Sequence, residues 1–192
     1  GDGVTEGPPL ADVLGPFPCR PSSPSMSPWA EDPAGTIMNA IAIGPDQVPI
    51  PASFASIGDG LVLTTFEGLS PDTDYTFEVQ GRSDGSFRTM PTSSGVVRLA
   101  FGADIHPDSK PYRAFARIRE AAPHLYVGLG DQIYADLDPT GPVGTTYADY
   151  EALYRRTWSD ADLLAAFANV PSTLVWDDHE LWNDYDRTIP EA

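Results

Sequence analysis

Two stretches decide the fold of the second half of this sequence: residues 125–134 read LYVGLGDQIY, and residues 172–183 read STLVWDDHELWN. Each begins as a short apolar run of strand length and passes directly into a polar segment with carboxylates. A third stretch, residues 96–106, reads VVRLAFGADIH and has the same form. Apolar residues at helical spacing separate the three stretches. Strands that alternate with helices predict a parallel sheet of the α/β class.

The helices between these strands carry recognisable start signals. Ser109 is a plausible N-cap for the first helix, which Pro123 ends. Thr146 and Asp149 have the spacing of a capping box and predict the start of a second helix. Ser159 with Asp162 repeats the device and predicts a third helix.

Polar side chains follow each predicted strand where it ends. The carboxyl ends of parallel strands meet at one crevice of an open α/β sheet, so we expect these side chains to converge. Taken singly, each has an ordinary explanation: an aspartate can cap a helix, a histidine can lie on the surface, and an acidic run can be a solvated turn. Taken together, carboxylates and imidazoles predict a metal site. The set comprises Asp104, His106, Asp131, Asp177, Asp178 and His179.

The first half of the sequence has a different character. Residues 1–33 are rich in Gly, Pro and Ser and predict an extended arm with little regular structure. Residues 34–93 alternate short β-like runs with turns and predict an all-β module. Within it, Leu69, Pro71, Thr73 and Tyr75 have a spacing that resembles the tyrosine corner of fibronectin type III and immunoglobulin-like sandwiches. No convergent chemistry appears there, so we interpret the module as non-catalytic.

Composition narrows the possible functions. A formal net charge of −17 argues against nucleic acid as a partner, because few positive groups are available to neutralise phosphates. No apolar run has the length of a membrane span, and no signal-peptide pattern opens the sequence. One cysteine, Cys19, cannot form a disulfide within the chain.

Two motifs carry a family resemblance: residues 130–134, GDQIY, and residues 176–180, WDDHE, with Asn183 soon after. With Asp104-x-His106 ahead of them, they resemble the calcineurin-like metallophosphoesterases, and more narrowly the alkaline phosphatase D and phospholipase D-like (PhoD-like) branch. The resemblance extends over roughly residues 36–190 and includes a β-sandwich ahead of the catalytic domain. It implies that residues 94–192 form the first half of a metallophosphoesterase αββα domain.

The resemblance also implies roles for individual residues. Asp104 and His106 are expected to hold one metal ion, Asp131 to bridge two, and Asp178 with Asn183 to hold the second. Tyr134 is expected to be a further ligand, and His179 to act at the leaving group beside Asp178. This branch usually has Cys where the sequence has Asp104, so oxygen and nitrogen ligands replace a thiolate. Divalent or trivalent Fe, Mn, Zn or Ca suit such a set.

The expected activity is metal-dependent hydrolysis of phosphomonoesters or phosphodiesters. Only 13 residues follow His179, and none is histidine, whereas the family supplies further histidines from a second half of the domain. We therefore expect a C-terminal fragment or second chain to complete the site. The alternative is a non-catalytic metal-binding or interaction fragment. The resemblance also implies a secreted, periplasmic or cell-envelope location.

Overall fold

The computed structural model describes residues 15, 17–19, 21–22, 24–80, 85–92, 94–136 and 144–185, which form two compact units. The first unit takes in residues 1–98 and 167–171, and the second takes in residues 99–166 and 172–192. Each is described by itself. Within the described parts of the chain, no helix is both long and apolar enough to cross a membrane.

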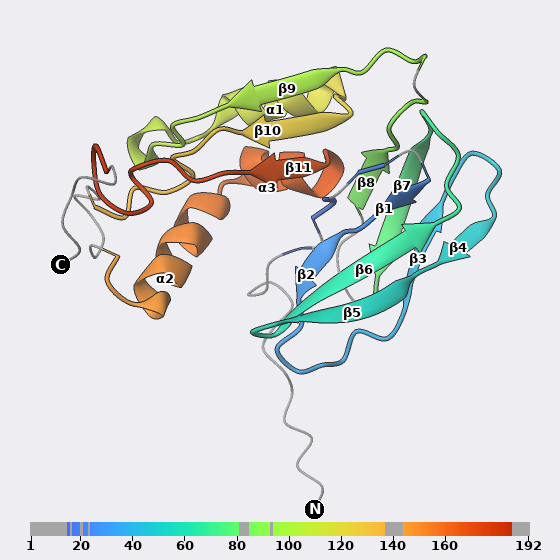
Figure 1. Ribbon diagram of the computed structural model, residues 1–192, viewed down its shortest axis with the longest axis horizontal. Coiled ribbons are helices and arrows are strands. Elements are labelled where there is room, and N and C mark those ends of the chain that lie inside the picture. Colours follow the sequence, from blue (N-terminus) through green and yellow to red (C-terminus); the bar gives the residue numbers. More distant parts are fainter. Residues whose placement is uncertain are drawn as a thin grey trace, which may run out of the picture. The chain divides into compact units, whose positions relative to one another are not determined.

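The first unit contains two antiparallel sheets (Figure 1). In one, β6 (Leu61–Glu67) pairs with β1 (Ser25–Met26), β2 (Trp29–Glu31) and β5 (Ser53–Gly58). The other has the order β4 (Pro49–Pro51), β3 (Ala40–Ile43), β7 (Asp74–Val79), β8 (Gly85–Arg88). Alternating side chains from both sheets form a single core, with Met26, Phe66, Phe77 and Phe87 at its centre. An all-β module is therefore present, and its likeness to fibronectin type III stays a prediction.

The hydrogen bond expected of a tyrosine corner is present. The hydroxyl of the buried Tyr75 accepts the backbone N–H of Ser70 at 2.9 Å. Since Tyr75 lies on β7, this bond ties the preceding turn to the second sheet. Residues 82–85, RSDG, predict a turn, and most of this segment falls outside the described residues.

The interpretation of residues 1–33 as an arm with little regular structure is wrong for residues 25–31. Strands β1 and β2 lie there and place the fully buried Met26 and Ala30 in the core. These strands are very short, and Pro24 and Pro28 precede them, so no alternating pattern is long enough to be recognised. Their pairing with β6 is a tertiary contact that local composition does not reveal.

The second unit is built on a parallel sheet of order β9–β10–β11 (Figure 1). Its strands are β9 (Leu99–Gly102), β10 (Leu125–Gly128) and β11 (Ser172–Leu174), which confirms the predicted α/β architecture. The 3₁₀ turn η2 (Pro107–Ser109) and helix α1 (Arg113–Ala121) connect β9 to β10. Helices α2 (Tyr147–Trp158) and α3 (Ala161–Asn169) precede β11.

Two of the three predicted helix starts need correction. The Thr146–Asp149 capping box at the start of α2 is confirmed. Ser109, however, ends the 3₁₀ turn, and α1 begins after Tyr112 without a side-chain cap. Ser159 is the C-cap of α2, and the carboxylate of Asp160 accepts the first backbone N–H groups of α3. Asp160 is the stronger cap because its ionised carboxylate accepts more than one N–H.

Candidate metal centre

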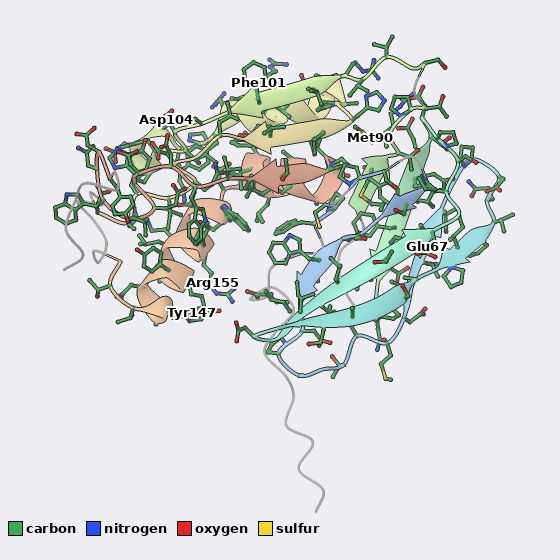
Figure 2. The ribbon with its side chains drawn as sticks, viewed as in Figure 1. Glu67, Met90, Phe101, Asp104, Tyr147 and Arg155 are labelled. Carbon is green, nitrogen blue, oxygen red and sulfur yellow. The ribbon has the colours of Figure 1, made fainter. Side chains whose placement is uncertain are left out.

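The strand ends bring the predicted polar residues to one edge of the parallel sheet. Gly102, Gly128 and Leu174 lie in register across β9, β10 and β11. The ladder continues one step further, with Leu129 N–H donating to Gly102 O at 2.8 Å and Val175 N–H to Gly128 O at 3.0 Å. Every polar loop therefore leaves the sheet at the same level. Figure 2 shows Asp104 just beyond the β9 end that carries Phe101.

Two aspartates in these loops have an unusual backbone conformation. Asp104 has φ +59° and Asp131 has φ +52°, both in the left-handed region that non-glycine residues rarely adopt. The N–H of Ile105 donates to the carbonyl of Asp131 at 2.8 Å and links the two loops. Such strain persists only where the surrounding structure holds it. Here the sheet and this cross-loop bond hold both aspartates at the same edge.

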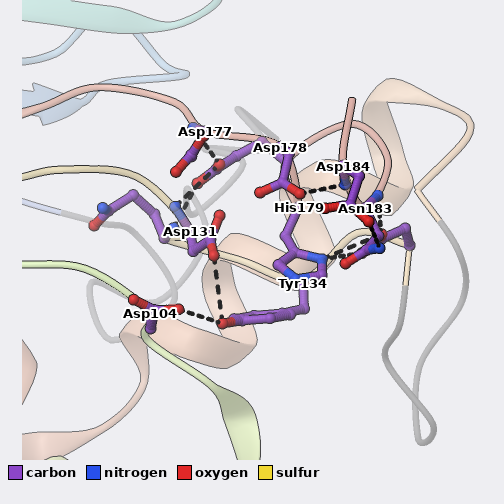
Figure 3. A network of polar contacts seen from close by, with 11 residues as sticks. Asp104, Asp131, Tyr134, Asp177, Asp178, His179, Asn183 and Asp184 are labelled. Carbon is purple, nitrogen blue, oxygen red and sulfur yellow. Dashed lines mark hydrogen bonds and ion pairs between the residues drawn. The ribbon is translucent and has the colours of Figure 1, made fainter. Parts of the chain in front are cut away.

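Asp131, Asp178 and His179 form the centre of the site (Figure 3). One ligand atom from each lies within 4.8 Å of the other two. Asp131 is only 6% exposed, and its Oδ1 has no hydrogen-bond partner within the described residues. Burial raises the pKa of Asp131 to about 6, with the nearby charges of Glu180 and Asp178 acting in the same direction against His179. An orphaned buried oxygen among acidic and imidazole groups suits a bound cation.

Tyr134 connects this centre to the β9 loop. Its hydroxyl donates to Asp104 Oδ1 at 3.3 Å and lies 3.5 Å from Asp131 Oδ2 (Figure 3). Its ring centre lies 4.7 Å from that of His106 and 4.3 Å from that of His179. Burial raises the pKa of Tyr134, and the charges of Asp131 and Asp104 raise it further. Without a cation, the phenol is therefore a protonated hydrogen-bond donor.

Helix α2 supports Tyr134 from behind. The residues on either side of Tyr134, Ile133 and Ala135, are almost fully buried and pack with Leu153 of α2. This small core fixes the loop that carries both Asp131 and Tyr134. Helix α2 therefore bears on the site through Leu153, although none of its side chains is a candidate ligand.

The structure places the remaining predicted ligands at the periphery. His106 Nδ1 accepts the N–H of Asp108 at 3.2 Å, and the imidazole makes an edge-to-face contact with the Tyr134 ring. Asn183 is exposed, and its Nδ2 donates to Asp184 Oδ2 at 2.9 Å. The structure thus brings Asp131, Asp178 and His179 together, joins Asp104 and Tyr134 to them, and leaves the Asn183 side chain bonded within the next turn.

Two functional candidates escaped the sequence interpretation. The Asp136 side chain is 2% exposed, and its carboxylate accepts His179 Nδ1 at 3.0 Å and the Asn183 N–H at 2.5 Å. Glu180, also 2% exposed, accepts backbone N–H groups from both motif loops. Glu180 belongs to a quoted motif, yet nothing local assigns it a partner. Asp136 follows Asp131 by five residues, and no spacing rule connects it with His179.

Neighbouring groups shift the pKa values of His179 and Asp178 on the loop after β11. Burial lowers the pKa of His179, but the hydrogen bond and charge of Asp136, with smaller contributions from Asp131 and Asp178, outweigh it and leave the pKa raised. The pKa of Asp178 is lowered, chiefly because its carboxylate accepts the N–H of Asp184. The pair therefore combines an ionised carboxylate with an imidazole that readily carries a proton.

Comparison with known proteins identifies the second unit. Residues 100–192 match the family model of the PhoD-like phosphatases. This part of the chain is similar to the PhoD-like phosphatases. Alkaline phosphatase D from Bacillus subtilis (strain 168) is 30% identical over 144 residues, covering 65% of this chain and 25% of that protein. The predicted family resemblance is thereby confirmed.

The solved structure of PhoD has the same fold. It superposes with a TM-score of 0.69 at 23% identity, over 100% of this chain and 43% of the PhoD chain. This PhoD-like chain therefore spans about a quarter of its curated relative and less than half of the solved one.

Proposed function

We propose that this PhoD-like chain provides part of a two-metal centre that hydrolyses phosphate monoesters or diesters. The observation that carries the proposal is the convergence of Asp131, Asp178 and His179, together with the unpartnered Oδ1 of the buried Asp131. The family match supports the choice of phosphate esters as substrates. Without a cation, a buried carboxylate beside a second one is electrostatically unfavourable, so the arrangement is best understood as a binding site.

The candidate ligands fall on both sides of Asp131. Asp104, with His106 and Tyr134, would hold one ion, and Asp178, with Asn183, would hold the other. Binding on the second side requires the Asn183 side chain to leave Asp184, to which it is bonded in this structure. Two bound cations would activate a water and offset charge on the phosphoryl oxygens. The oxygen-rich set suits divalent or trivalent Fe, Mn, Zn or Ca.

His179 is the proposed proton donor. Asp136 holds its Nδ1, so the tautomer and ring orientation are set and Nε2 is left free for the substrate side. In hydrolysis, a water oxygen bonds to phosphorus, the ester bond breaks, and His179 transfers its proton to the departing oxygen. The hydrogen bond and charge of Asp136 raise the pKa of His179 and so favour its protonated form.

Some ligands of the proposed two-metal centre come from outside this chain. The chain spans 43% of the solved PhoD, so we propose that a further segment or partner chain supplies the missing ligands. A secreted or cell-envelope location is also proposed, from the family resemblance. The net charge of −17 continues to argue against nucleic acid as a partner.

The test compares metal content and hydrolysis in the wild type, Asp131→Asn and the control Asp74→Asn. Asp74 is an exposed aspartate in an ion pair on β7, far along the sequence from the site. With the missing segment supplied, and after loading with Zn²⁺ and gel filtration, elemental analysis should find about two ions per chain in the wild type and control. Asp131→Asn should lose both ions, since Asp131 is the proposed bridge.

Release of p-nitrophenol from its phosphate monoester and diester, with and without EDTA, completes the test. Hydrolysis that survives both EDTA and Asp131→Asn would show that the catalytic site lies elsewhere. A wild-type chain that retains no metal and hydrolyses neither ester, even with the missing segment supplied, would refute the proposed function.

A further inference from the structure

A buried glutamate joins the two motif loops beneath the metal centre. Glu180 Oε2 accepts the N–H of Asp131 at 3.1 Å and that of Asp177 at 2.9 Å. Its Oε1 accepts the N–H of Gln132 at 2.5 Å. Within the described residues, no Lys, Arg or His forms an ion pair with Glu180. Both oxygens are instead used on backbone donors that lie 49, 48 and 3 residues away in sequence.

The same two loops touch directly beside this carboxylate. Gly130 has φ +119°, and a Cβ at this position would lie 2.3 Å from the Cβ of Asp177 and 2.9 Å from its backbone N. The loops are therefore in van der Waals contact as well as hydrogen-bonded. A side chain at residue 130 therefore does not fit between the two loops.

Glu180 is also rigidly connected to the ligands on its own loop. It follows Asp178 and His179 directly, and the carbonyl of Asp178 accepts the N–H groups of Leu181 and Trp182 at 2.8 and 2.7 Å. This tight turn contains Glu180. On the other loop, Glu180 holds the backbone of Asp131 in its left-handed conformation. One side chain thus spans from the Asp178–His179 turn to the Asp131 backbone.

We propose that Glu180 is a positioning residue that sets the spacing of Asp131 from Asp178 and His179, and thereby the affinity of the centre for metal. The inference rests on the proposed function, since it assigns Glu180 a task at that same site. A carboxylate is required because both oxygens accept N–H groups. An amide of the same shape offers one acceptor and turns its NH₂ group toward a backbone donor.

The test measures Zn²⁺ affinity by isothermal titration in the wild type, Glu180→Gln and Glu151→Gln. Glu151 is a matched control: a glutamate of the same unit, on α2, paired with Arg155 on the surface. Residues that orient metal ligands typically contribute about 10–100-fold to metal affinity. Glu180→Gln should therefore weaken Zn²⁺ binding at least about tenfold, and Glu151→Gln should leave it unchanged.

Amide hydrogen exchange separates positioning from simple stabilisation. In the wild type, Zn²⁺ should slow exchange at the N–H groups of Asp131, Gln132 and Asp177 more than at core amides of the first unit. This measurement needs no variant, so it remains decisive if Glu180→Gln does not fold.

The possible failures are distinct. A Glu180→Gln chain that binds Zn²⁺ as tightly as the wild type would overturn the positioning role and leave the metal centre intact. So would a wild type whose three amides exchange at the same rate with and without bound Zn²⁺. A wild type that binds no Zn²⁺ would overturn the proposed function, and the role of Glu180 with it.

Discussion

Replacing Gly130 by alanine is expected to disrupt the junction between the two motif loops. At φ +119° an L-residue is strained, at a cost of about 1–3 kcal/mol. The added Cβ would also lie 2.3 Å from the Asp177 Cβ, and overpacking of this kind costs about 1–3 kcal/mol. Together the terms amount to on the order of 4 kcal/mol. That is a large part of the total stability of a typical domain.

The assay is equilibrium urea unfolding followed by tryptophan fluorescence. Trp158, Trp176 and Trp182 lie in the second unit, so their signal reports on the part of the chain that contains the junction. Zn²⁺ titration should show weakened binding in the same variant, because Asp177 precedes the ligand Asp178 directly.

Two control substitutions separate the contributions. Gly68→Ala, in the first unit and followed through Trp29, has a positive φ of +72° with nothing within 4 Å of the new Cβ, so it measures backbone strain alone, about 1–2 kcal/mol. Gly102→Ala has no positive φ and meets only the Tyr126 hydroxyl at 3.2 Å, so it should cost less than about 1 kcal/mol. A Gly130→Ala variant no less stable than Gly68→Ala would refute the argument from close loop contact.

Three further predictions concern stability. In EDTA, burial raises the pKa of Asp131 to about 6 from an ordinary 3.8, so protonation of this carboxyl stabilises the folded state. That stabilisation is complete below about pH 4 and is lost as pH rises through 6. Asp131→Asn should therefore raise the free energy of unfolding at pH 8, by on the order of 3 kcal/mol, and change nothing at pH 3.5; equal urea midpoints at pH 8 would contradict the burial argument. Asp160→Ala should cost about 1–2 kcal/mol in thermal unfolding and Ser159→Ala less than about 0.5, and the reverse order would restore Ser159 as the cap. Tyr75→Phe leaves a backbone N–H unpaired and should cost about 1–2 kcal/mol, whereas Tyr147→Phe, at 73% exposure, should cost nothing measurable.

Local patterns predicted the skeleton of the second unit because they depend on near neighbours. Apolar runs of strand length that end in glycine or aspartate located β10 and β11, and the parallel pairing followed from the intervening helices. The Thr146–Asp149 capping box was recognisable because both of its hydrogen bonds lie within one turn. Where adjacent residues could each cap a helix, as with Ser159 and Asp160, the local pattern was ambiguous and the stronger acceptor was not distinguished.

Contacts between distant residues escaped prediction. Strands β1 and β2 exist because β6 pairs with them across thirty or more residues of sequence. The bonds of Asp136 and Glu180 reach partners 43 to 49 residues away in sequence. The exception is the bond from the Asp177 N–H to Glu180, which is local. A side chain that accepts backbone N–H groups imposes no residue type on its partners, so neither motif nor spacing records the bond.

The sequence by itself determined the α/β class of the second unit, its likeness to the PhoD-like phosphatases, and which carboxylates and imidazoles stand at the strand ends. These follow from periodicity and from the identity of residues in short motifs. Only the tertiary structure decided how those groups act on one another: that Asp131 is buried with a raised pKa, that Asp136 holds His179, and that Glu180 ties the loops. The physical reason is that burial and hydrogen bonding depend on what surrounds a group in space, and folding brings those surroundings from distant parts of the chain.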